Sequence, residues 1–443
     1  MPGITIPMHL LSRRLLAFAA STALIVACGG SGGGSPSPTP SGPAPTPTPT
    51  GAVTACLGAT PAPTTTPPPG PSPAPPAGLA VASGLHIQRL ATVSSARELV
   101  SLPNGDLLIG TTGSTVALLP FAENATGALS AHTFATVADG PDSGVAFSSS
   151  LCTIFVGTQH GVYAIPYSYG DQTARSSPAL IASIRTGSPP TGSDGDVHTT
   201  TSVTYSEVTN LLDVAVGSSC NACVETDATR ASIFQMTATG GATTKRATRI
   251  RNGIALTSNP SSGHVWVGDA GQDTLPSTHP FEFVDDVTTH GGVADYGWPD
   301  CEENHIAYTS GAQCAATVAP ILEFPAYSTI VGAAFYPAQT GLTYAFPAQY
   351  RGGLFVTRHG SWHTPGGCNV IPEVDFVPMN GDVPASAVDW SDPSKQWQPF
   401  VTGFQPGCSS STRIGRPTGV TVSATGTLFI ADDQAGVIYR IRP

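Results

Sequence analysis

One pattern of apolar and polar positions recurs along the chain from about residue 79 onward. Each copy has a turn, a short strand with an aliphatic or aromatic centre, a small or polar stop, and a second strand. The strands are rich in β-branched and aromatic residues and are bounded by glycine, aspartate and serine, a composition typical of β-structure. Six copies can be counted, at residues 105–112, 152–167, 210–219, 263–271, 352–362 and 426–441.

This repetition predicts an all-β fold, a six-bladed β-propeller. A unit of a few antiparallel strands cannot bury its apolar face alone, so several units have to stack against one another. A β-sandwich is the alternative, although sandwiches seldom repeat one motif so often. We expect an early strand at 85–93 to complete the last blade beside 437–443, because a closed ring removes exposed sheet edges.

The N-terminal 27 residues have a different pattern. Arg13 and Arg14 precede the apolar run "LLAFAASTALIVA", which has the length of a signal-peptide core and is too short to span a bilayer. The run ends in Ala27-Cys28, which resembles a bacterial lipobox. We therefore expect residues 1–27 to be a lipoprotein signal peptide and a lipidated Cys28 to anchor the protein at an extracytoplasmic membrane surface of a bacterial cell envelope. An ordinary signal, cleaved after one of the alanines, is the alternative.

Residues 28–78 are almost all proline, glycine, serine, threonine and alanine. Such a segment cannot bury enough apolar surface to fold, and its proline content favours an extended polyproline II conformation. At ~3.1 Å per residue it could hold a domain on the order of 100 Å from a membrane. We expect residues 28–78 to be a disordered tether and residues 79–443 to form the propeller.

Charge and cysteine content narrow the function classes. Charged residues are 11% of the chain, its formal net charge is −11, and the absence of a basic run argues against a nucleic-acid partner. Eight cysteines remain besides Cys28, an even number that suits disulfides in an oxidising compartment. We expect the local pairs Cys220–Cys223 and Cys301–Cys314 and leave the other four cysteines open. The stretch "CNACV" lacks the histidine of a c-type haem site. A zinc site would need a second closely spaced pair of cysteines, and the sequence shows none.

Polar residues beside the strands are candidates for one shared site. A propeller gathers the residues at one end of its inner strands around a central cavity, and loops on such a scaffold often carry catalytic groups. His198, Arg251, His359 and Arg416 each lie beside a predicted strand. We therefore expect these four side chains to meet, although they are far apart in sequence.

Seven stretches extend this interpretation. The chain contains, in order, "SARELVSLPNGDLLIGT", "VHTTTSVTY", "VGSSCNACVE", "RIRNGIAL", "GGVADYGWPDC", "YRGGLFVTRHGSW" and "GRPTGVTVSATGTLFIADDQAGVIYRI". Over roughly residues 85–443 this order resembles the glucose/sorbosone dehydrogenase family of soluble sugar dehydrogenases. The resemblance implies a six-bladed propeller that holds pyrroloquinoline quinone (PQQ) and calcium and oxidises a sugar.

The resemblance also implies roles for individual residues. His198 matches the family's general base, which takes the proton of the sugar's anomeric hydroxyl while hydride leaves the same carbon. Arg251 and Asn252 match the pair beside the quinone, where a guanidinium stabilises charge on the quinone oxygen. Taken singly, His198 could cap a turn, and Arg251 could be a surface residue of a basic stretch in which Arg249 is a competing position.

Three further residues match positions around the cofactor. The three carboxylates of PQQ call for cationic groups and hydrogen-bond donors, and the matching residues are Arg97, His359 and Arg416. Each also has a structural explanation. Arg97 could be a solvated charge at a strand end, His359 could pack against Trp362, and Arg416 could brace a turn, with Arg413 as its substitute.

The stretch "GDAGQD" at 268–273 matches the family's calcium loop. Gly271 and Gln272 are the expected ligands, since calcium accepts main-chain oxygens and would act as a Lewis acid on the quinone. An acidic surface loop is the alternative. Three residues depart from the family pattern: Tyr327 replaces a frequent histidine, Gln272 a frequent arginine or proline, and Val197 an acidic neighbour of the base. These departures bear on the substrate more than on the fold, and they leave room for an inactive member.

Three functions remain open on the sequence. The leading hypothesis is a PQQ- and calcium-dependent dehydrogenase of an aldose or related sugar, whose electrons pass to an external acceptor because the chain has no haem motif. A calcium-dependent propeller lactonase or esterase would not need the cluster of arginines. The third hypothesis is a surface-displayed propeller that binds glycans or a protein partner without catalysis.

Overall fold

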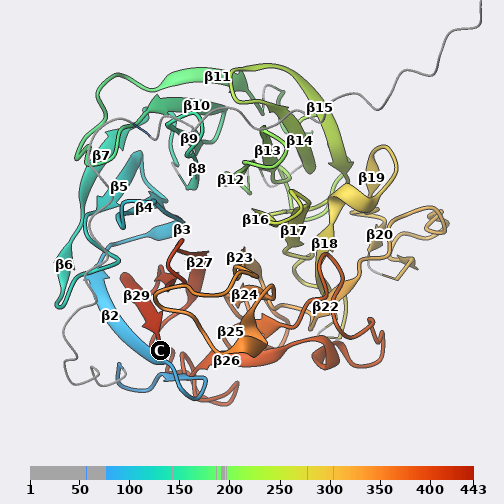
Figure 1. Cartoon of the computed structure of the whole chain (residues 1–443). Coiled ribbons are helices and arrows are strands. Elements are labelled where there is room, and N and C mark those ends of the chain that lie inside the picture. Colours follow the sequence, from blue (N-terminus) through green and yellow to red (C-terminus); the bar gives the residue numbers. More distant parts are fainter. Residues whose placement is uncertain are drawn as a thin grey trace, which may run out of the picture. The chain divides into compact units, whose positions relative to one another are not determined.

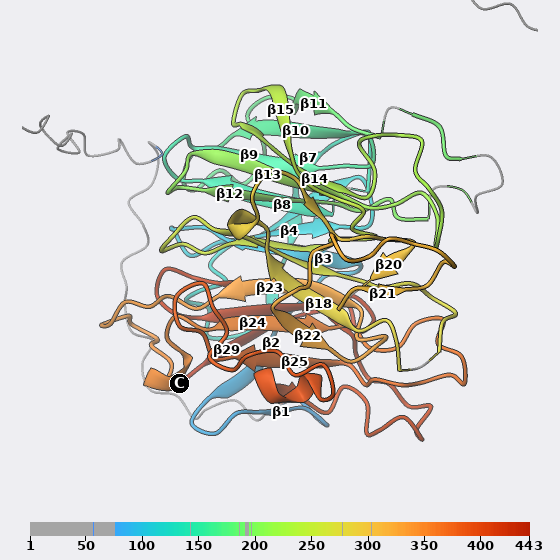
Figure 2. The same ribbon diagram turned by 90° about the vertical axis from the view of Figure 1, so that its right-hand side faces the viewer.

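Six mostly antiparallel sheets form a ring in the part of the chain that the computed structural model describes, which is residue 56 and residues 76–443 except 142, 186, 191–194, 196, 277 and 303. Figure 1 shows the six sheets as the blades of a propeller around a central axis. Figure 2 shows the ring from the side, where most strands run along that axis. The predicted signal peptide, Cys28 and nearly all of the predicted tether lie outside the described residues.

Each blade is built from four consecutive or nearly consecutive strands. Blade 1 has β3 (Ala96–Ser101), β4 (Leu107–Thr111), β5 (Thr115–Leu119) and β7 (His132–Thr136). Blade 2 has β8 (Gly144–Ser148), β9 (Thr153–Gly157), β10 (Gly161–Pro166) and β11 (Ala179–Ser183). Blade 3 has β12 (Thr201–Ser206), β13 (Leu211–Val216), β14 (Ser232–Thr237) and β15 (Gly240–Thr248), with the short β19 (Ala294–Asp295) at its edge.

The second half of the ring follows the same plan. Blade 4 has β16 (Ala255–Ser258), β17 (Val265–Asp269), β18 (Glu282–Asp286) and β22 (Leu322–Phe324). Blade 5 has β23 (Ile330–Phe335), β24 (Leu354–Arg358), β25 (Glu373–Val377) and β26 (Gln398–Thr402), and blade 6 has β27 (Pro417–Val422), β28 (Leu428–Asp432) and β29 (Val437–Arg442). A separate hairpin joins β20 (Cys301–Glu302) to β21 (Ile306–Ala307). The described helices are short 3-10 turns, η1 (Val287–Thr289), η2 (Ala348–Tyr350) and η3 (Pro393–Gln396), and none is long and apolar enough to cross a membrane.

The N-terminal strands close the ring. The strand β2 (His86–Thr92) pairs antiparallel with β29, with His86 opposite Arg442, so the predicted closure of the last blade is confirmed. The short β6 (Leu129–Ser130) continues this blade beside β2. The sequence did not predict β1 (Ala80–Val81), which pairs with β26 and adds a strand to blade 5. The start of the domain is therefore tied to two successive blades.

The repeated sequence signature marks the second strand of each blade rather than the innermost one. In β4, β17, β24 and β28 every residue is buried, because the neighbouring blades cover both faces of these strands. This is why the signature reads as a continuous apolar run. The innermost strands that line the axis are β3, β8, β12, β16, β23 and β27. Two of them, β3 and β12, carry several polar residues.

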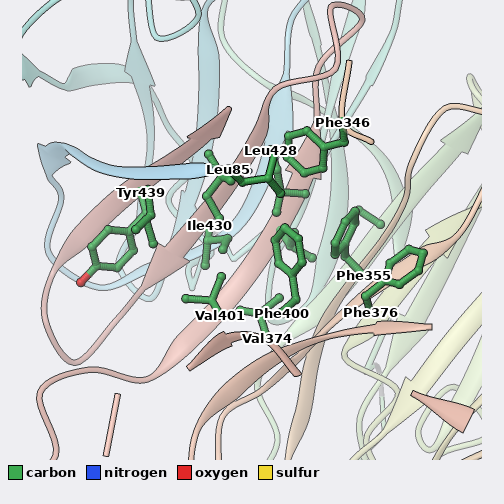
Figure 3. Close-up of a cluster of buried hydrophobic side chains, with 14 of the residues drawn as sticks. Leu85, Phe346, Phe355, Val374, Phe376, Phe400, Val401, Leu428, Ile430 and Tyr439 are labelled. Carbon is green, nitrogen blue, oxygen red and sulfur yellow. The ribbon is translucent and has the colours of Figure 1, made fainter. Parts of the chain in front are cut away.

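The apolar core lies between neighbouring blades. Figure 3 shows one such cluster, which contains Phe355 and Phe376 of blade 5 together with Ile430 of blade 6. Phe355 is fully buried, and its ring centroid lies 4.6 Å from that of Phe400. Burial of large side chains like these contributes roughly 1.5–3 kcal/mol each, so contacts between blades hold the ring together and fix the polar residues at its axis.

Four disulfides connect the eight described cysteines. The expected local pairs Cys220–Cys223 and Cys301–Cys314 are confirmed. The other two pairs are Cys56–Cys152 and Cys368–Cys408. Cys56 is a departure from the prediction, because it falls within the expected tether and yet is buried in the core of blades 1 and 2. Cys56 is thus fastened to the propeller by its disulfide with Cys152.

Candidate active site

The structure brings most of the predicted site residues to one cavity. Its volume is ≈ 390 Å³, within the range of small-molecule sites, and it lies where β12, β16 and β27 begin. Five of the six blades contribute to its wall. The predicted residues that line it are Arg97, His198, Arg251, Asn252, Gly271, His359 and Arg416. Their common location follows from the structure, while the role of each stays a prediction.

His198 has the protonation pattern of a base. It precedes β12, and its Nδ1 lies 2.8 Å from the Ser218 hydroxyl and 3.1 Å from the Ser218 carbonyl oxygen. Because that hydroxyl donates its own hydrogen to the Cys220 carbonyl oxygen at 2.7 Å, the imidazole donates from Nδ1 and keeps its lone pair on Nε2. Burial, aided by the charge of Arg251, holds the pKa of His198 well below its usual range. The ring is therefore neutral at pH 7.

Gly217 permits the close approach of His198 and Asn252. A Cβ atom at Gly217 would lie 2.6 Å from the Asn252 Oδ1 and 2.6 Å from the His198 Cβ, so a larger residue there would push both side chains away. The Asn252 backbone N–H donates to Asp269 at 2.6 Å. Among the described residues its side-chain amide has no hydrogen-bond partner, so the amide is available to a ligand in the cavity.

Arg251 is fixed by a set of oxygen acceptors. It is 3% exposed, and its guanidinium donates to the Asn221 carbonyl at 3.0 Å, the Asn221 Oδ1 at 2.8 Å and the Ala270 carbonyl at 2.9 Å. It also pairs with Asp273 at 3.0 Å. The competing Arg249 instead donates to the Trp298 carbonyl at 3.1 Å and is not part of the cavity wall. The structure thus places Arg251, and not Arg249, at the site.

Asp433 joins two predicted cofactor residues. Its Oδ2 pairs with the Arg97 guanidinium at 2.8 Å, and its Oδ1 lies 2.9 Å from the His359 Nε2. Burial alone would raise the pKa of Asp433, but the hydrogen bond with His359 and the charge of Arg97 lower it to about 2. Burial lowers the pKa of His359 to about 4. Sequence reasoning missed Asp433, although the doublet Asp432-Asp433 after an apolar strand was a visible signal.

Arg416 lies beside an exposed aromatic ring. Its guanidinium donates to the carbonyl oxygens of His359 and Gly360 at 2.8 and 3.0 Å, and it lies 5.0 Å from the ring centroid of Trp362. Trp362 is 54% exposed and lines the cavity, so its indole offers an aromatic surface to a bound ring. The substitute residue Arg413 binds Gln405 and lies outside the cavity wall.

The predicted calcium loop divides between the cavity and the protein interior. Gly271 lines the cavity, whereas Gln272 is buried and its amide donates to the Glu302 carboxylate at 2.7 Å and the Pro299 carbonyl at 3.1 Å. The Gln272 side chain is thus engaged elsewhere, and a metal could use only its backbone oxygen. Burial raises the pKa of Glu302 to about 8.

A second residue that sequence reasoning missed is Glu282. It begins β18, is 4% exposed, lines the cavity and accepts a hydrogen bond from the Ile330 N–H at 3.0 Å. A Cβ atom at Gly271 would lie 3.6 Å from the Glu282 Cγ, so this carboxyl group adjoins the predicted calcium loop. Burial raises the pKa of Glu282 to about 8, and the nearby Asp269 adds to that effect. An acidic residue within the apolar stretch "PFEFV" was the available signal.

Two of the residues that depart from the family pattern also reach this cavity. Tyr327 is 4% exposed, and its hydroxyl donates to the Leu275 carbonyl. It therefore fixes the segment that follows the predicted calcium loop. Val197 is 42% exposed at the cavity wall beside His198, where it offers an apolar surface to a substrate.

Solved structures of similar fold include several sugar oxidoreductases. The calcium structure of Trichoderma reesei Carbohydrate-Active Enzymes Family AA12 has 20% identity, covers 82% of this chain and 97% of its own, and has a TM-score of 0.67. The holo form of the pyranose dehydrogenase PQQ domain from Coprinopsis cinerea has 18% identity, covers 84% and 98%, and has a TM-score of 0.66. The soluble aldose sugar dehydrogenase from Escherichia coli has 16% identity, covers 81% and 100%, and has a TM-score of 0.54. At these identities the likeness establishes the six-bladed fold.

A comparison with protein families assigns the chain to one family. The model of the family described as TrAA12-like matches residues 79–304 and 300–443, which is nearly the whole of the predicted domain. A curated relative, an uncharacterized protein of Borreliella burgdorferi, is 24% identical over 196 residues. That match covers 43% of this chain and 47% of the relative, so it spans about half the length of the curated relative.

Proposed function

Because this chain belongs to the TrAA12-like family, we propose that it is a PQQ- and calcium-dependent dehydrogenase that oxidises an aldose or a related sugar. One observation carries the proposal. Arg97, Arg251, His359 and Arg416 come from four different blades and meet in one cavity beside the base His198. A lactonase or a glycan-binding propeller has no need of three arginines gathered beside two imidazoles.

The charge of the cavity suits a ligand with several carboxylates. Three arginines in its wall face two paired carboxylates, Asp273 and Asp433, and the raised pKa of Glu282 leaves that group largely protonated at pH 7. The wall is thus positively charged before a ligand enters. The guanidinium of Arg416 is balanced only by carbonyl oxygens in its hydrogen bonds, so it can form charge-assisted hydrogen bonds with an anion.

Arg97, Asn252, His359 and Arg416 would hold the quinone, and PQQ would supply the acceptor for a hydride from the sugar. Around that acceptor, the Nε2 of His198 would take the hydroxyl proton, and the Ser218 hydrogen bonds keep the ring aimed. Arg251 would stabilise negative charge that develops beside it, since its own hydrogen bonds hold it rigidly.

Calcium would fit at Gly271 and Gln272 through their carbonyl oxygens, as in the sequence-based prediction. The Glu282 carboxyl group adds an oxygen ligand of the kind that calcium prefers. No cationic side chain forms an ion pair with Glu282 among the described residues, so calcium would displace the proton that the raised pKa leaves on this carboxyl group at pH 7.

An absorbance titration of the purified protein with PQQ and Ca²⁺, followed by dye reduction with a panel of aldoses, tests the proposal. We expect saturable quinone binding and sugar-dependent reduction. His198→Ala should keep the binding and lose roughly 10²–10⁴-fold in rate, and His86→Ala, at an exposed edge of β2, should match the wild type. Absence of both quinone binding and dye reduction would refute the proposal.

The position of the protein in the cell is a second part of the proposal. We propose that a lipidated Cys28 anchors the propeller at the envelope, where an external acceptor takes the electrons. Cys28→Ala should release the protein from a washed membrane fraction, and a protein that stays in that fraction would contradict the anchor.

A further inference from the structure

The segment between β13 and Cys223 contacts both predicted catalytic residues. Residues 217–223 form no helix or strand. Even so, Ser218 binds the His198 imidazole through its hydroxyl and its carbonyl oxygen, and the Ser218 N–H donates to the Arg251 carbonyl at 2.8 Å. One short irregular segment therefore sets the positions of the base and of the arginine.

Asn221 is the centre of the hydrogen bonds around Arg251. Its backbone oxygen accepts from the Arg251 Nε at 3.0 Å and the Trp298 Nε1 at 3.2 Å. Its side-chain Oδ1 accepts from the Arg251 Nη2 and from the Asp273 N–H, both at 2.8 Å, and its Nδ2 donates to the Asp273 carbonyl at 3.1 Å. A carboxamide both accepts and donates, so it can bind a guanidinium and a peptide group together.

The Cys220–Cys223 disulfide holds this asparagine in place. It links the residues on either side of Asn221 and Ala222, which limits the conformations of a segment without regular structure. Cys220 is 2% exposed and packs with Ala231 and Trp298. Cys220 thus attaches the segment to the apolar interior, and Asn221 attaches it to Arg251.

We infer that Asn221, held by the Cys220–Cys223 disulfide, is a positioning residue for Arg251 and for the loop at Gly271. Asn221 binds Asp273 directly. It acts on Ala270 through Arg251, which donates to the Ala270 carbonyl. The consequence for sugar oxidation rests on the proposed function. The positioning of Arg251 does not, and it can be measured in the protein without quinone.

The first experiment measures the reactivity of single arginines toward phenylglyoxal by peptide mapping. Arg416 is an internal reference, because its hydrogen bonds go to His359 and Gly360 and not to Asn221. Asn221→Ala should raise the modification rate of Arg251 relative to Arg416 about tenfold, since one of its charged hydrogen bonds is lost. Asn221→Asp loses the amide donor to Asp273 but keeps an acceptor oxygen for Arg251, so the modification rate of Arg251 should stay close to that of the wild type. The matched control is Asn380→Ala, an exposed asparagine.

The second experiment separates this inference from the proposed function. With PQQ, Ca²⁺ and a sugar, Asn221→Ala should lower kcat about tenfold and leave the KM for the sugar unchanged, and Asn221→Asp should restore most of kcat. If the wild type binds no quinone, the proposed function fails and the arginine reactivity alone decides the inference.

Two results would overturn the positioning role. In one, Arg251 reacts at the same rate in Asn221→Ala and in the wild type. In the other, the reactivities of Arg251 and Arg416 rise together, which would indicate a general loosening. Should Asn221→Ala fail to fold, the double variant Cys220→Ala/Cys223→Ala decides, because it keeps Asn221 but releases its segment and should again raise the Arg251 rate alone.

Discussion

The Oδ1 of Asp433 lies 2.9 Å from the Nε2 of His359, although the two residues belong to different blades. The other carboxylate oxygen of Asp433 pairs with Arg97 in a third blade. One partly buried carboxylate therefore ties three blades together at the rim of the cavity, and it orients two of the residues that the sequence assigns to the cofactor.

Loss of this carboxylate should weaken the domain as well as the site. Asp433→Asn keeps the shape but removes the charge opposite Arg97, so we expect the free energy of unfolding to fall by about 1–3 kcal/mol. Urea unfolding measures the change. The control is Asp389→Asn, at an exposed ion pair with Lys395, which should change little. Equal effects of the two substitutions would contradict the role of Asp433.

Gly217→Ala should damage catalysis more than stability. The added Cβ would lie 2.6 Å from atoms of His198 and Asn252, and a shift of about 1 Å in a reacting group can cost on the order of 100-fold in rate. Steady-state kinetics and a thermal melt together provide the comparison. Gly127→Ala is the control, because a Cβ there meets no atom within 4 Å. A Gly217→Ala enzyme with wild-type kcat would show that the close approach is not needed.

The acid limb of the pH profile should lie below pH 6.5. Burial and the charge of Arg251 lower the pKa of His198, and a base with a lowered pKa stays deprotonated at more acidic pH. Arg251→Gln removes one cause, so the remaining activity of this variant should decline at a higher pH than that of the wild type. The measurement is kcat/KM against pH with a sugar that does not ionise. An acid limb at or above pH 6.5 in the wild type would argue against His198 as the base.

His359 should make stability depend on pH. Burial lowers its pKa to about 4, against the opposing effect of Asp433 and with the support of Arg416 and Arg97. Between pH 6.5 and 4 the unfolded chain binds a proton that the folded chain does not, so stability falls as the pH falls through this window. The Tm of His359→Gln should decline less than that of the wild type between pH 7 and 4.5. Parallel declines would contradict this assignment, and His86→Gln serves as the control.

The Cys56–Cys152 disulfide should matter more for stability than Cys301–Cys314. It closes a loop of 96 residues, whereas the other closes 13, and the loss of a longer cross-link frees more conformations of the unfolded chain. Replacing both Cys56 and Cys152 by serine should cost about 2–4 kcal/mol and leave quinone binding intact. Denaturant unfolding of the two double-serine variants compares the pairs directly. An equal or larger loss for the short loop would contradict the expectation.

Much of the fold could be predicted because it is encoded locally. The apolar second strands, the six copies of the motif, the closing strand at 85–93 and the two short disulfides all depend on residues close in sequence or on a repeated pattern. The match of residues 79–304 and 300–443 to the TrAA12-like family confirms the resemblance to quinoprotein sugar dehydrogenases. The positions of His198, Arg251 and Arg416 beside predicted strands had already marked them as candidates, and their roles came from that resemblance.

The partners of these residues could not be predicted. Asp433 was missed because its two partners lie 336 and 74 residues away. Asn221 was missed because its segment has no periodic pattern, and Glu282 because a single acidic residue in a strand has several explanations. The buried Gln272 amide and the fastening of Cys56 likewise depend on contacts between segments far apart in the chain.

The sequence by itself determined where the apolar second strand of each blade lies and that the strands form six stacked units, because apolar runs and turns act over a few residues. Only the tertiary structure decided which polar groups meet at the axis. Closing the ring brings strand ends from five blades to one cavity, and the course of each irregular loop then sets which oxygen faces which guanidinium.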